Sequence, residues 1–305
     1  MIAAFARSLL SGAVVSGTPL LYATLAEVIG ERAGVVNLGL EGVMLVGAVT
    51  GFVTAVHTGS AAMGVLAAAL AGAALNAIFA WLVVDRRANQ LATGLALMFA
   101  GVGLSALLGA PYVGRPITGL PELAVPGLAS LPVLGPALFV HDALVYAAVP
   151  IALATRWALF STRWGLALRA VGENPVAAFA AGRHPRVLQY QALLLAGALG
   201  GIAGADLSIG VARTWAEWMT AGRGFIAVAL VIFARWQPLR AIAGAYLFGG
   251  AISLQLLLQT RGVPVSPFVL DMLQYVLSLA VLVVWGGTGR RAAPASLGRV
   301  FQGSQ

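Results

Sequence analysis

The sequence contains no cysteine, and all 18 of its Lys and Arg residues are arginine. Without cysteine the chain forms no disulfide, no thiolate metal site and no cysteine nucleophile. Without lysine it lacks the residue with which a P-loop contacts the phosphates of ATP, so ATP hydrolysis by that route is excluded. The three histidines are too scattered to predict a metal site: His57, His141 and His184.

Charged residues are also scarce. They make up 9% of the 305 residues, and hydrophobic residues make up 60%. A typical soluble domain is about 25% charged, because it has to cover its surface with polar groups. A soluble enzyme is therefore excluded, and so is a disordered or nucleic-acid-binding chain, despite the pI of about 11.0.

Long hydrophobic runs recur along the whole sequence and predict transmembrane helices. A membrane-spanning barrel would instead have short alternating strands. We expect an all-α, polytopic integral membrane protein with about nine transmembrane helices, one of them broken or re-entrant. The nine segments are residues 8–29, 33–56, 61–84, 91–112, 137–154, 188–210, 224–234, 241–260 and 268–285.

Two of these segments are irregular. Segment 224–234 is shorter than the roughly 20 residues that span a bilayer, so it has to recruit residues before it or enter the membrane only in part. Segment 33–56 contains polar residues and several glycines near its start, which leaves open whether it crosses fully.

The arginines predict the orientation. If the segments alternate, thirteen of the 18 arginines fall on one side of the membrane. Arginine and lysine accumulate in cytoplasmic loops, so that side is predicted to be cytoplasmic. The C-terminus is then in the cytoplasm and the N-terminus outside, in a multi-pass protein of the plasma membrane.

No composition change marks a domain boundary. We expect one transmembrane domain over residues 1–285, with a long cytoplasmic loop at 155–187. A short arginine-containing cytoplasmic tail is expected at 286–305.

The long loop contains the sequence of a short capped helix. Asn174 is a favourable N-cap, Pro175 suits the first helical position, and Gly182 suits the C-terminal stop. The residues between them are mostly alanine, which gives a small-residue face. Such a helix either docks into a groove on a partner or lies on the membrane interface.

This loop resembles the coupling-helix loop of ABC importer permeases, which docks on the ATP-binding subunit. The spacing of its Glu, Ala and Gly residues is similar to that of the branched-chain amino acid and ribose class. Residues 26–42 (AEVIGERAGVVNLGLEG) resemble the nucleoside and simple-sugar branch more narrowly, as do 88–97 and 220–244, and the resemblance runs over roughly residues 20–285. It implies coupling to an ATPase through Arg169, Gly172, Glu173, Asn174, Ala177, Ala178 and Gly182.

The resemblance also implies the partners and the activity. A chain of this kind is the permease subunit of an importer for nucleosides or related sugars, and a separate subunit hydrolyses ATP. The expected partners are that ATP-binding subunit, a second and different permease chain, and an extracytoplasmic solute-binding protein. It is not itself an enzyme, and no cofactor is expected.

Two polar residues in the first of these stretches are candidates for the transport pathway. Asn37 and Glu41 lie four residues apart in apolar sequence, on one face if the segment is helical there. Polar groups inside a membrane are costly and usually face a cavity or a partner. The alternative is that Glu41 pairs with Arg32 or another arginine, or caps a helix, at the cytoplasmic edge.

A second polar group follows the turn at residues 85–87. Asn89, Gln90 and Thr93 are candidates for the inner end of the pathway, or else they cap a helix at the interface. The competing functional hypothesis is a secondary transporter driven by an ion gradient, which would need buried carboxylates or broken helices in matched halves. An intramembrane enzyme has no support, because the sequence lacks a catalytic triad, a metal set and paired carboxylates.

Overall fold

The computed structural model describes residues 2–262, the single residues 266, 269, 272, 276, 277, 279, 280 and 283, and residues 293–299. Within these ranges the chain is mainly helical, with one small two-stranded sheet. The predicted ninth segment, 268–285, falls largely outside the described residues.

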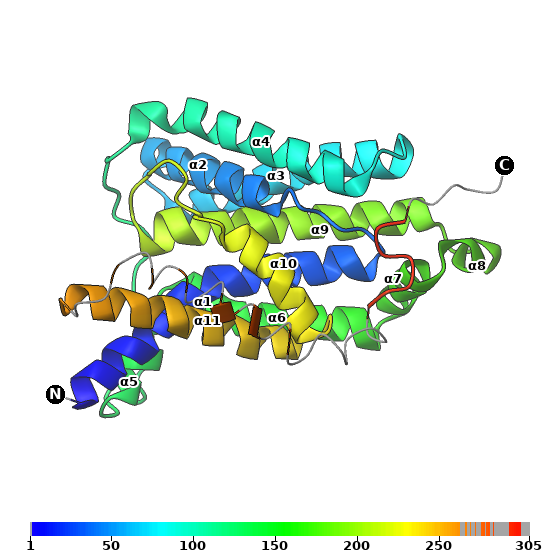
Figure 1. The fold of residues 1–305 in the computed structure, drawn as a ribbon. Coiled ribbons are helices and arrows are strands. Elements are labelled where there is room, and N and C mark those ends of the chain that lie inside the picture. The colour runs from blue at the N-terminus through cyan, green and yellow to red at the C-terminus, as the bar shows by residue number, and fades with distance from the viewer. Residues whose placement is uncertain are drawn as a thin grey trace.

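Most of the helices follow one another with short connections, whereas residues 113–133 and 212–222 form longer ones (Figure 1). The long ones are α1 (Ile2–Arg32), α2 (Leu40–Thr58), α3 (Ala61–Ala80), α4 (Gln90–Gly109), α6 (Ala143–Ser161), α9 (Pro185–Ala205) and α11 (Pro238–Thr260). The shorter ones are α5 (Leu134–Leu138), α7 (Arg163–Glu173), α8 (Pro175–Ala180) and α10 (Arg223–Ala234). Two π-helical turns extend α3 and α9, at Trp81–Asp85 and Asp206–Val211, and a 3-10 turn at Ala110–Tyr112 extends α4.

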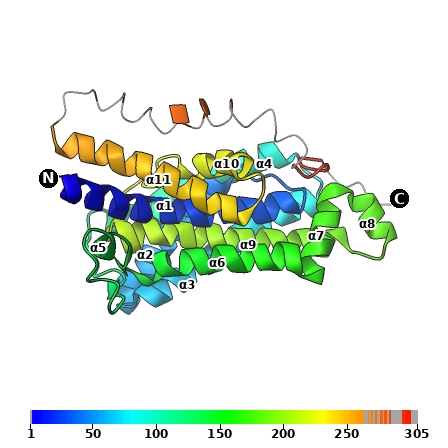
Figure 2. The same ribbon diagram turned by 90° about the horizontal axis from the view of Figure 1, so that it is seen from below.

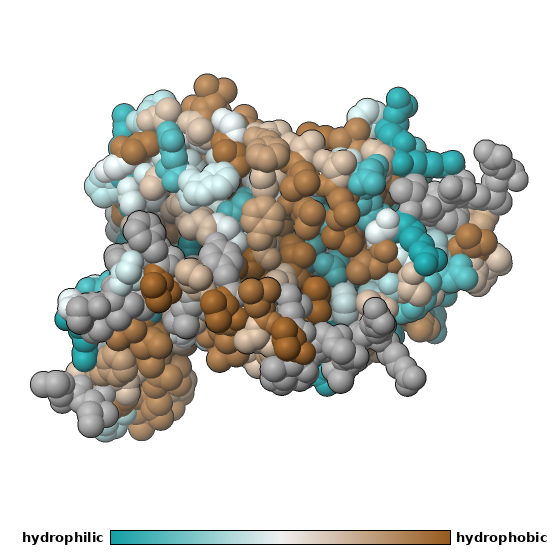
Figure 3. All heavy atoms as spheres, in the orientation of Figure 1, coloured by the Kyte–Doolittle hydropathy of each residue, from teal (hydrophilic) through white to brown (hydrophobic). Residues whose placement is uncertain are grey.

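Seven helices in the described part of the chain are long and apolar enough to cross a membrane, and α10 is a shorter apolar helix. This confirms the all-α, polytopic fold, although the count of nine is not reproduced there. The longer helices run roughly side by side, and α10 crosses the middle of the bundle obliquely (Figure 1). In a space-filling view the hydrophobic residues gather across the middle and the hydrophilic residues toward the two ends (Figure 3).

α2 and α9 form the centre of the bundle. In an apolar 18-residue stretch of each, 72% of the residues are buried. Glycines allow this close packing: a Cβ placed on Gly72 of α3 would lie 2.2 Å from the carbonyl oxygen of Gly197 on α9. Small residues at such contacts are typical of membrane helices, because they let the backbones approach.

Two predicted segments begin later than the hydropathy suggested. α6 starts at Ala143 because the carboxylate of Asp142 accepts hydrogen bonds from the backbone N–H groups of Leu144 and Val145, at 2.8 and 3.1 Å. α2 starts at Leu40, so residues 33–39 form a non-helical linker between α1 and α2.

The elements outside the bundle lie at its two ends. α5 and the two-residue strands β1 (Leu123–Ala124) and β2 (Val140–His141), which pair antiparallel, belong to the segment between α4 and α6. α5 lies at the same end as the N-terminus, and α7 and α8 lie at the opposite end (Figure 2). We call that opposite end the α7–α8 end.

Candidate functional site

The α7–α8 hairpin has the caps that the sequence predicted. The side chain of Asn174 accepts a hydrogen bond from the backbone N–H of Ala177 at 3.0 Å, which begins α8. Gly182 ends the turn after α8 with a φ of 75°, in the left-handed region that favours glycine. A backbone hydrogen bond of 2.9 Å from Arg183 to Ala178 closes this turn. Both ends of α8 are therefore capped.

The exposed surface of α8 is more apolar and bulkier than expected. Ala178 is buried beneath the helix, whereas Ala177 is exposed. Val176 and Phe179 are large apolar side chains that are 64% and 43% exposed. Sequence reasoning considered the alanines and overlooked these two residues, although they flank the alanines in the same stretch. Large apolar groups exposed together often mark an interaction surface.

The base of the hairpin is tied to the rest of the molecule. The guanidinium of Arg169 lies over the ring of Phe160, 4.9 Å from its centroid, so this residue anchors α7 to α6. Gly172 is buried, and a Cβ there would lie 2.2 Å from the carbonyl oxygen of Arg32. Glu173 is exposed, and its carboxylate accepts a hydrogen bond of 3.2 Å from the backbone N–H of Ala295.

Asn37 belongs to the linker between α1 and α2. Its side-chain oxygen accepts a hydrogen bond from the backbone N–H of Gly39 at 2.8 Å, and its amide nitrogen donates to Asn76 of α3 at 3.0 Å. Asn76 in turn donates to the carbonyl oxygen of Leu193 on α9, at 2.9 Å. Asn37 and Glu41 do not share a helical face, because α2 begins only at Leu40. Asn76 is a further residue of this network that the sequence did not reveal.

Glu41 is fully buried at the start of α2, and its carboxylate binds the N-terminus of α10. One oxygen accepts from the hydroxyl of Thr220 and from the backbone N–H of Gly222 at 2.8 Å. The other accepts from the backbone N–H of Gly224 at 2.6 Å. A negative charge is favourable here because the N-terminus of a helix has unpaired N–H groups and a positive partial charge. Glu41 therefore caps a helix, and its predicted place in the translocation pathway stays a prediction.

Arg32 takes no part in that cap. Its guanidinium donates instead to the carbonyl oxygen of Trp236 at 3.2 Å and lies over the ring of Phe160. The cap of α10 was difficult to predict, because Thr220 and Gly222 are about 180 residues from Glu41 in the sequence. The pair of glycines at 222 and 224 was the only local signal for an unusual helix start.

The second polar group is divided between two roles. Asn89 caps α4, its side chain accepting from the backbone N–H of Ala92 at 3.0 Å. Gln90 is buried and accepts from the backbone N–H of Val36 at 2.9 Å, which connects α4 to the linker that holds Asn37. Thr93 is buried one turn further along α4. Gln90 is therefore hydrogen-bonded to the linker, whereas Glu41 is hydrogen-bonded to the start of α10.

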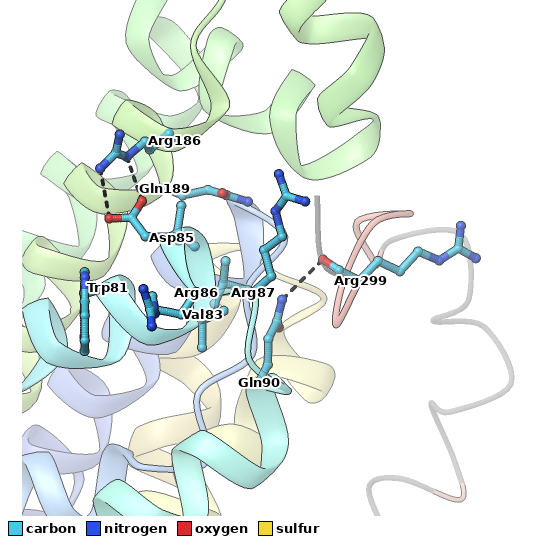
Figure 4. Close-up of a pocket in the computed structure, with 11 residues that line it drawn as sticks. Trp81, Val83, Asp85, Arg86, Arg87, Gln90, Arg186, Gln189 and Arg299 are labelled. Carbon is cyan, nitrogen blue, oxygen red and sulfur yellow. Dashed lines mark hydrogen bonds and ion pairs between the residues drawn. The ribbon is translucent and has the colours of Figure 1, made fainter. Parts of the chain in front are cut away.

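A pocket of about 410 Å³ opens beside Gln90 at the α7–α8 end (Figure 4). Asp85 and Arg186 form an ion pair of 2.7 Å on one side of it, between the turn after α3 and the first turn of α9. Tyr190 also donates to Asp85, at 2.7 Å. The polar and charged residues that line the pocket are Asp85, Arg86, Arg87, Gln90, Arg186, Gln189 and Arg299. Among the predicted pathway residues, Gln90 lines this pocket.

The sequence matches the family described as "Branched-chain amino acid transport system / permease component" over residues 9–285. It is 41% identical over 267 residues to a putative glucose ABC transporter permease protein, TsgC13, of Haloferax volcanii, covering 86% of this chain and 81% of that protein. It is 33% identical to the nucleoside ABC transporter permease protein NupC of Lactococcus lactis and 34% identical to the guanosine ABC transporter permease protein NupQ of Bacillus subtilis. Both alignments cover 93% of each chain. No solved structure matches.

Proposed function

The chain belongs to the family of branched-chain amino acid transport system permease components, and we propose that the solute it translocates is a nucleoside or a related sugar. It is the multi-pass permease subunit of an ABC importer and is not itself catalytic. The family implies an ATP-binding subunit and a substrate-binding protein as partners. Membership of this family also decides against the transporter driven by an ion gradient.

Two relatives support nucleosides as the first solute class. NupC and NupQ are named as nucleoside and guanosine permeases, and each aligns with this chain over 93% of both lengths. TsgC13, named for glucose, supports sugars as the second class. Because the chain contains no lysine for a P-loop, ATP hydrolysis is assigned to the partner subunit.

We assign the docking of the ATP-binding subunit to the α7–α8 hairpin. The capped helix α8 exposes Val176 and Phe179 at the α7–α8 end. The pocket at this end is lined by four arginines, Arg86, Arg87, Arg186 and Arg299. A partner that covers these apolar side chains removes their contact with water, which favours docking. Gly172, Glu173 and Arg169 then hold the base of the hairpin, and Ala177 and Ala178 belong to the docking helix itself.

We place the inner end of the solute pathway near the pocket beside Gln90. Asn89 and Thr93 flank Gln90 on α4, and Asn37 lies in the linker bonded to it. A break in a helix at membrane depth is tolerated where the backbone is buried in protein or lines a cavity. Glu41 then acts on transport by holding α10 in position.

A second, different permease chain completes the transporter in this proposal. It is inferred from the resemblance of this sequence to the nucleoside branch. Purification of the chain from its native membranes in mild detergent tests it directly. Recovery of an ATP-binding subunit with two distinct permease chains supports the proposal, and recovery of this permease alone with an ATP-binding subunit overturns the heterodimer.

The α7–α8 end is proposed to face the cytoplasm, with the N-terminus outside. Because the chain has no cysteine, single replacements Arg163→Cys and Glu217→Cys place one thiol on each side of the membrane. Both positions are exposed, one at the start of α7 and the other in the loop before α10. In intact cells a membrane-impermeant maleimide is expected to label only Glu217→Cys, with Arg163→Cys labelled after lysis; the reverse pattern refutes this orientation.

Uptake of labelled guanosine, uridine and glucose tests the solute class. Deletion of the chain is expected to abolish ATP-dependent uptake of at least one nucleoside, and a plasmid copy is expected to restore it. The uptake should persist when a protonophore removes the proton gradient while ATP is maintained. If neither nucleoside nor sugar uptake depends on the chain, the proposed solute class is wrong, although its place in the family is unaffected.

A further inference from the structure

The C-terminal residues 293–299 return to the α7–α8 end and lie against the base of α7 (Figure 1). The backbone N–H and the hydroxyl of Ser296 both donate to the carbonyl oxygen of Gly172, at 3.0 and 2.6 Å. The hydroxyl also lies 3.3 Å from the carbonyl oxygen of Val171. Together with the hydrogen bond from Ala295 to Glu173, these contacts cover the last turn of α7.

The same residues also bind the linker between α1 and α2. The backbone N–H of Gly298 donates to the carbonyl oxygen of Gly34 at 3.3 Å. The side chain of Gln90 donates to the carbonyl oxygen of Arg299, also at 3.3 Å (Figure 4). Since Gln90 itself accepts from the linker at Val36, the C-terminal residues, the linker and the start of α4 form one hydrogen-bonded junction.

The junction is closely packed. Ser296 is only 6% exposed. Gly34 has a φ of +86°, and a Cβ on it would lie 2.6 Å from the hydroxyl oxygen of Ser296. A Cβ on Gly172 would lie 3.3 Å from the backbone nitrogen of Gly34. The three segments therefore meet through their backbones, where a small displacement of one is passed directly to the others.

The three segments connect to different parts of the chain. The last turn of α7 leads into α8, the proposed docking helix. The linker leads through Asn37 into α2 and to Glu41, which holds α10. Residues 293–299 belong to neither of these regions, and their hydrogen bonds connect the last turn of α7 to the linker.

We propose that residues 294–299 form a positioning segment that holds the base of α7 against the 33–39 linker. A movement of α8 is thereby transmitted through the linker to the start of α2. The segment acts through its hydrogen bonds to the base of α7 and to the linker. The inference rests on the proposed docking of the ATP-binding subunit at α8. Loss of the segment leaves docking intact and disconnects ATP hydrolysis from transport.

A pair of truncations tests this proposal in the assembled transporter, reconstituted in liposomes with its ATP-binding subunit and solute-binding protein. A chain that ends at residue 292 lacks the segment, and a chain that ends at Arg299 keeps it. The first is expected to lower the amount of solute transported per ATP hydrolysed by about fivefold or more, while ATP hydrolysis persists, because coupling between sites typically corresponds to factors of this size. The second is expected to behave as the full chain.

Two point variants separate the role of the segment from a general effect on folding. Ser296→Ala removes the side-chain hydrogen bonds to α7 and keeps the backbone ones, so the transport-to-ATPase ratio should fall roughly two- to tenfold. Ala295→Ser is the matched control, because the exposed Ala295 contacts α7 through its backbone N–H and not through its side chain. Its ratio is expected to be unchanged. If the shorter truncation does not assemble, the comparison of Ser296→Ala with Ala295→Ser decides the question.

The outcomes distinguish a failure of the proposed docking site from a failure of the positioning role. If no ATP-binding subunit copurifies with the full chain, the docking assignment fails and the positioning role fails with it. If the subunit assembles and the truncation at 292 and Ser296→Ala both keep the full transport-to-ATPase ratio, only the positioning role is wrong. A truncation that loses ATP hydrolysis and transport equally, with its subunit still bound, also overturns it.

Discussion

Replacement of Glu41 by alanine is expected to abolish uptake and to lower the amount of folded protein in the membrane. The carboxylate of Glu41 accepts three hydrogen bonds, from Thr220, Gly222 and Gly224, at a position with no exposure to solvent. Alanine leaves these donors without their acceptor inside the bundle. Each hydrogen bond to a charged group is worth about 1.5–3 kcal/mol, so a loss of at least about 3 kcal/mol is expected.

Glu41→Gln gives an informative intermediate. Glutamine has nearly the same shape and keeps one acceptor oxygen, but its amide nitrogen is a donor that faces the backbone N–H groups of α10. It also removes the negative charge from the N-terminus of that helix. We expect partial loss of thermal stability in detergent and of uptake, with Glu41→Gln ranked between the wild type and Glu41→Ala.

Glu217→Ala is the matched control, because Glu217 is an exposed glutamate in the loop before the same helix. It is expected to have near wild-type stability and uptake. The measurements are membrane protein level, melting temperature in detergent and ATP-dependent uptake. If Glu41→Ala has wild-type stability and loses uptake alone, then Glu41 contacts the solute or its path, and its role as a structural cap of α10 is refuted.

Replacement of Phe179 by aspartate is expected to prevent binding of the ATP-binding subunit and thereby to abolish uptake. Phe179 is 43% exposed on α8, where the docked partner would cover it. Aspartate removes apolar area and places a charge that docking would have to desolvate. Truncation of a central aromatic residue at an interface commonly costs about 2 kcal/mol or more, which weakens binding about thirtyfold.

Copurification and uptake, measured together, check this prediction. Leu128→Asp is the matched control, since Leu128 is also 43% exposed but lies between α4 and α6, far from α8 in the sequence. It should copurify with the ATP-binding subunit as the wild type does. Val176→Asp should reproduce the defect of Phe179→Asp. Normal copurification of both α8 variants would show that the subunit docks elsewhere and that α8 lies on the membrane interface instead.

The α7–α8 hairpin shows which features of the candidate site could be predicted from the sequence. Its caps were predicted because Asn174 bonds to a backbone group three residues away and Gly182 adopts a local backbone conformation. Its exposed face was predicted less well. The alanines in this stretch suggested an alanine face. The side of α8 that is exposed depends instead on how α7 packs, and Val176 and Phe179 lie at the surface.

The polar residues within the apolar segments show the limit. The sequence singled out Asn37 and Glu41 because polar groups in apolar segments are costly. It singled out Gln90 because this residue follows the turn at residues 85–87. Their partners were not predictable: Asn37 binds Asn76, Glu41 binds the start of α10, and Gln90 binds both the linker and the backbone of Arg299. These partners are distant in the sequence, and no local pattern specifies which donor meets which acceptor.

The sequence alone determined the class of the protein and located the seven helices of the described residues that are long enough to cross a membrane. Hydropathy over some twenty residues and side-chain caps within three residues are local properties, and each is set by neighbouring residues. Only the tertiary structure decided that Glu41 caps α10 and that Ser296 closes a junction with Gly172 and Gly34. Such contacts follow from the close approach of helices at glycine, where the packing of the whole bundle determines which groups meet.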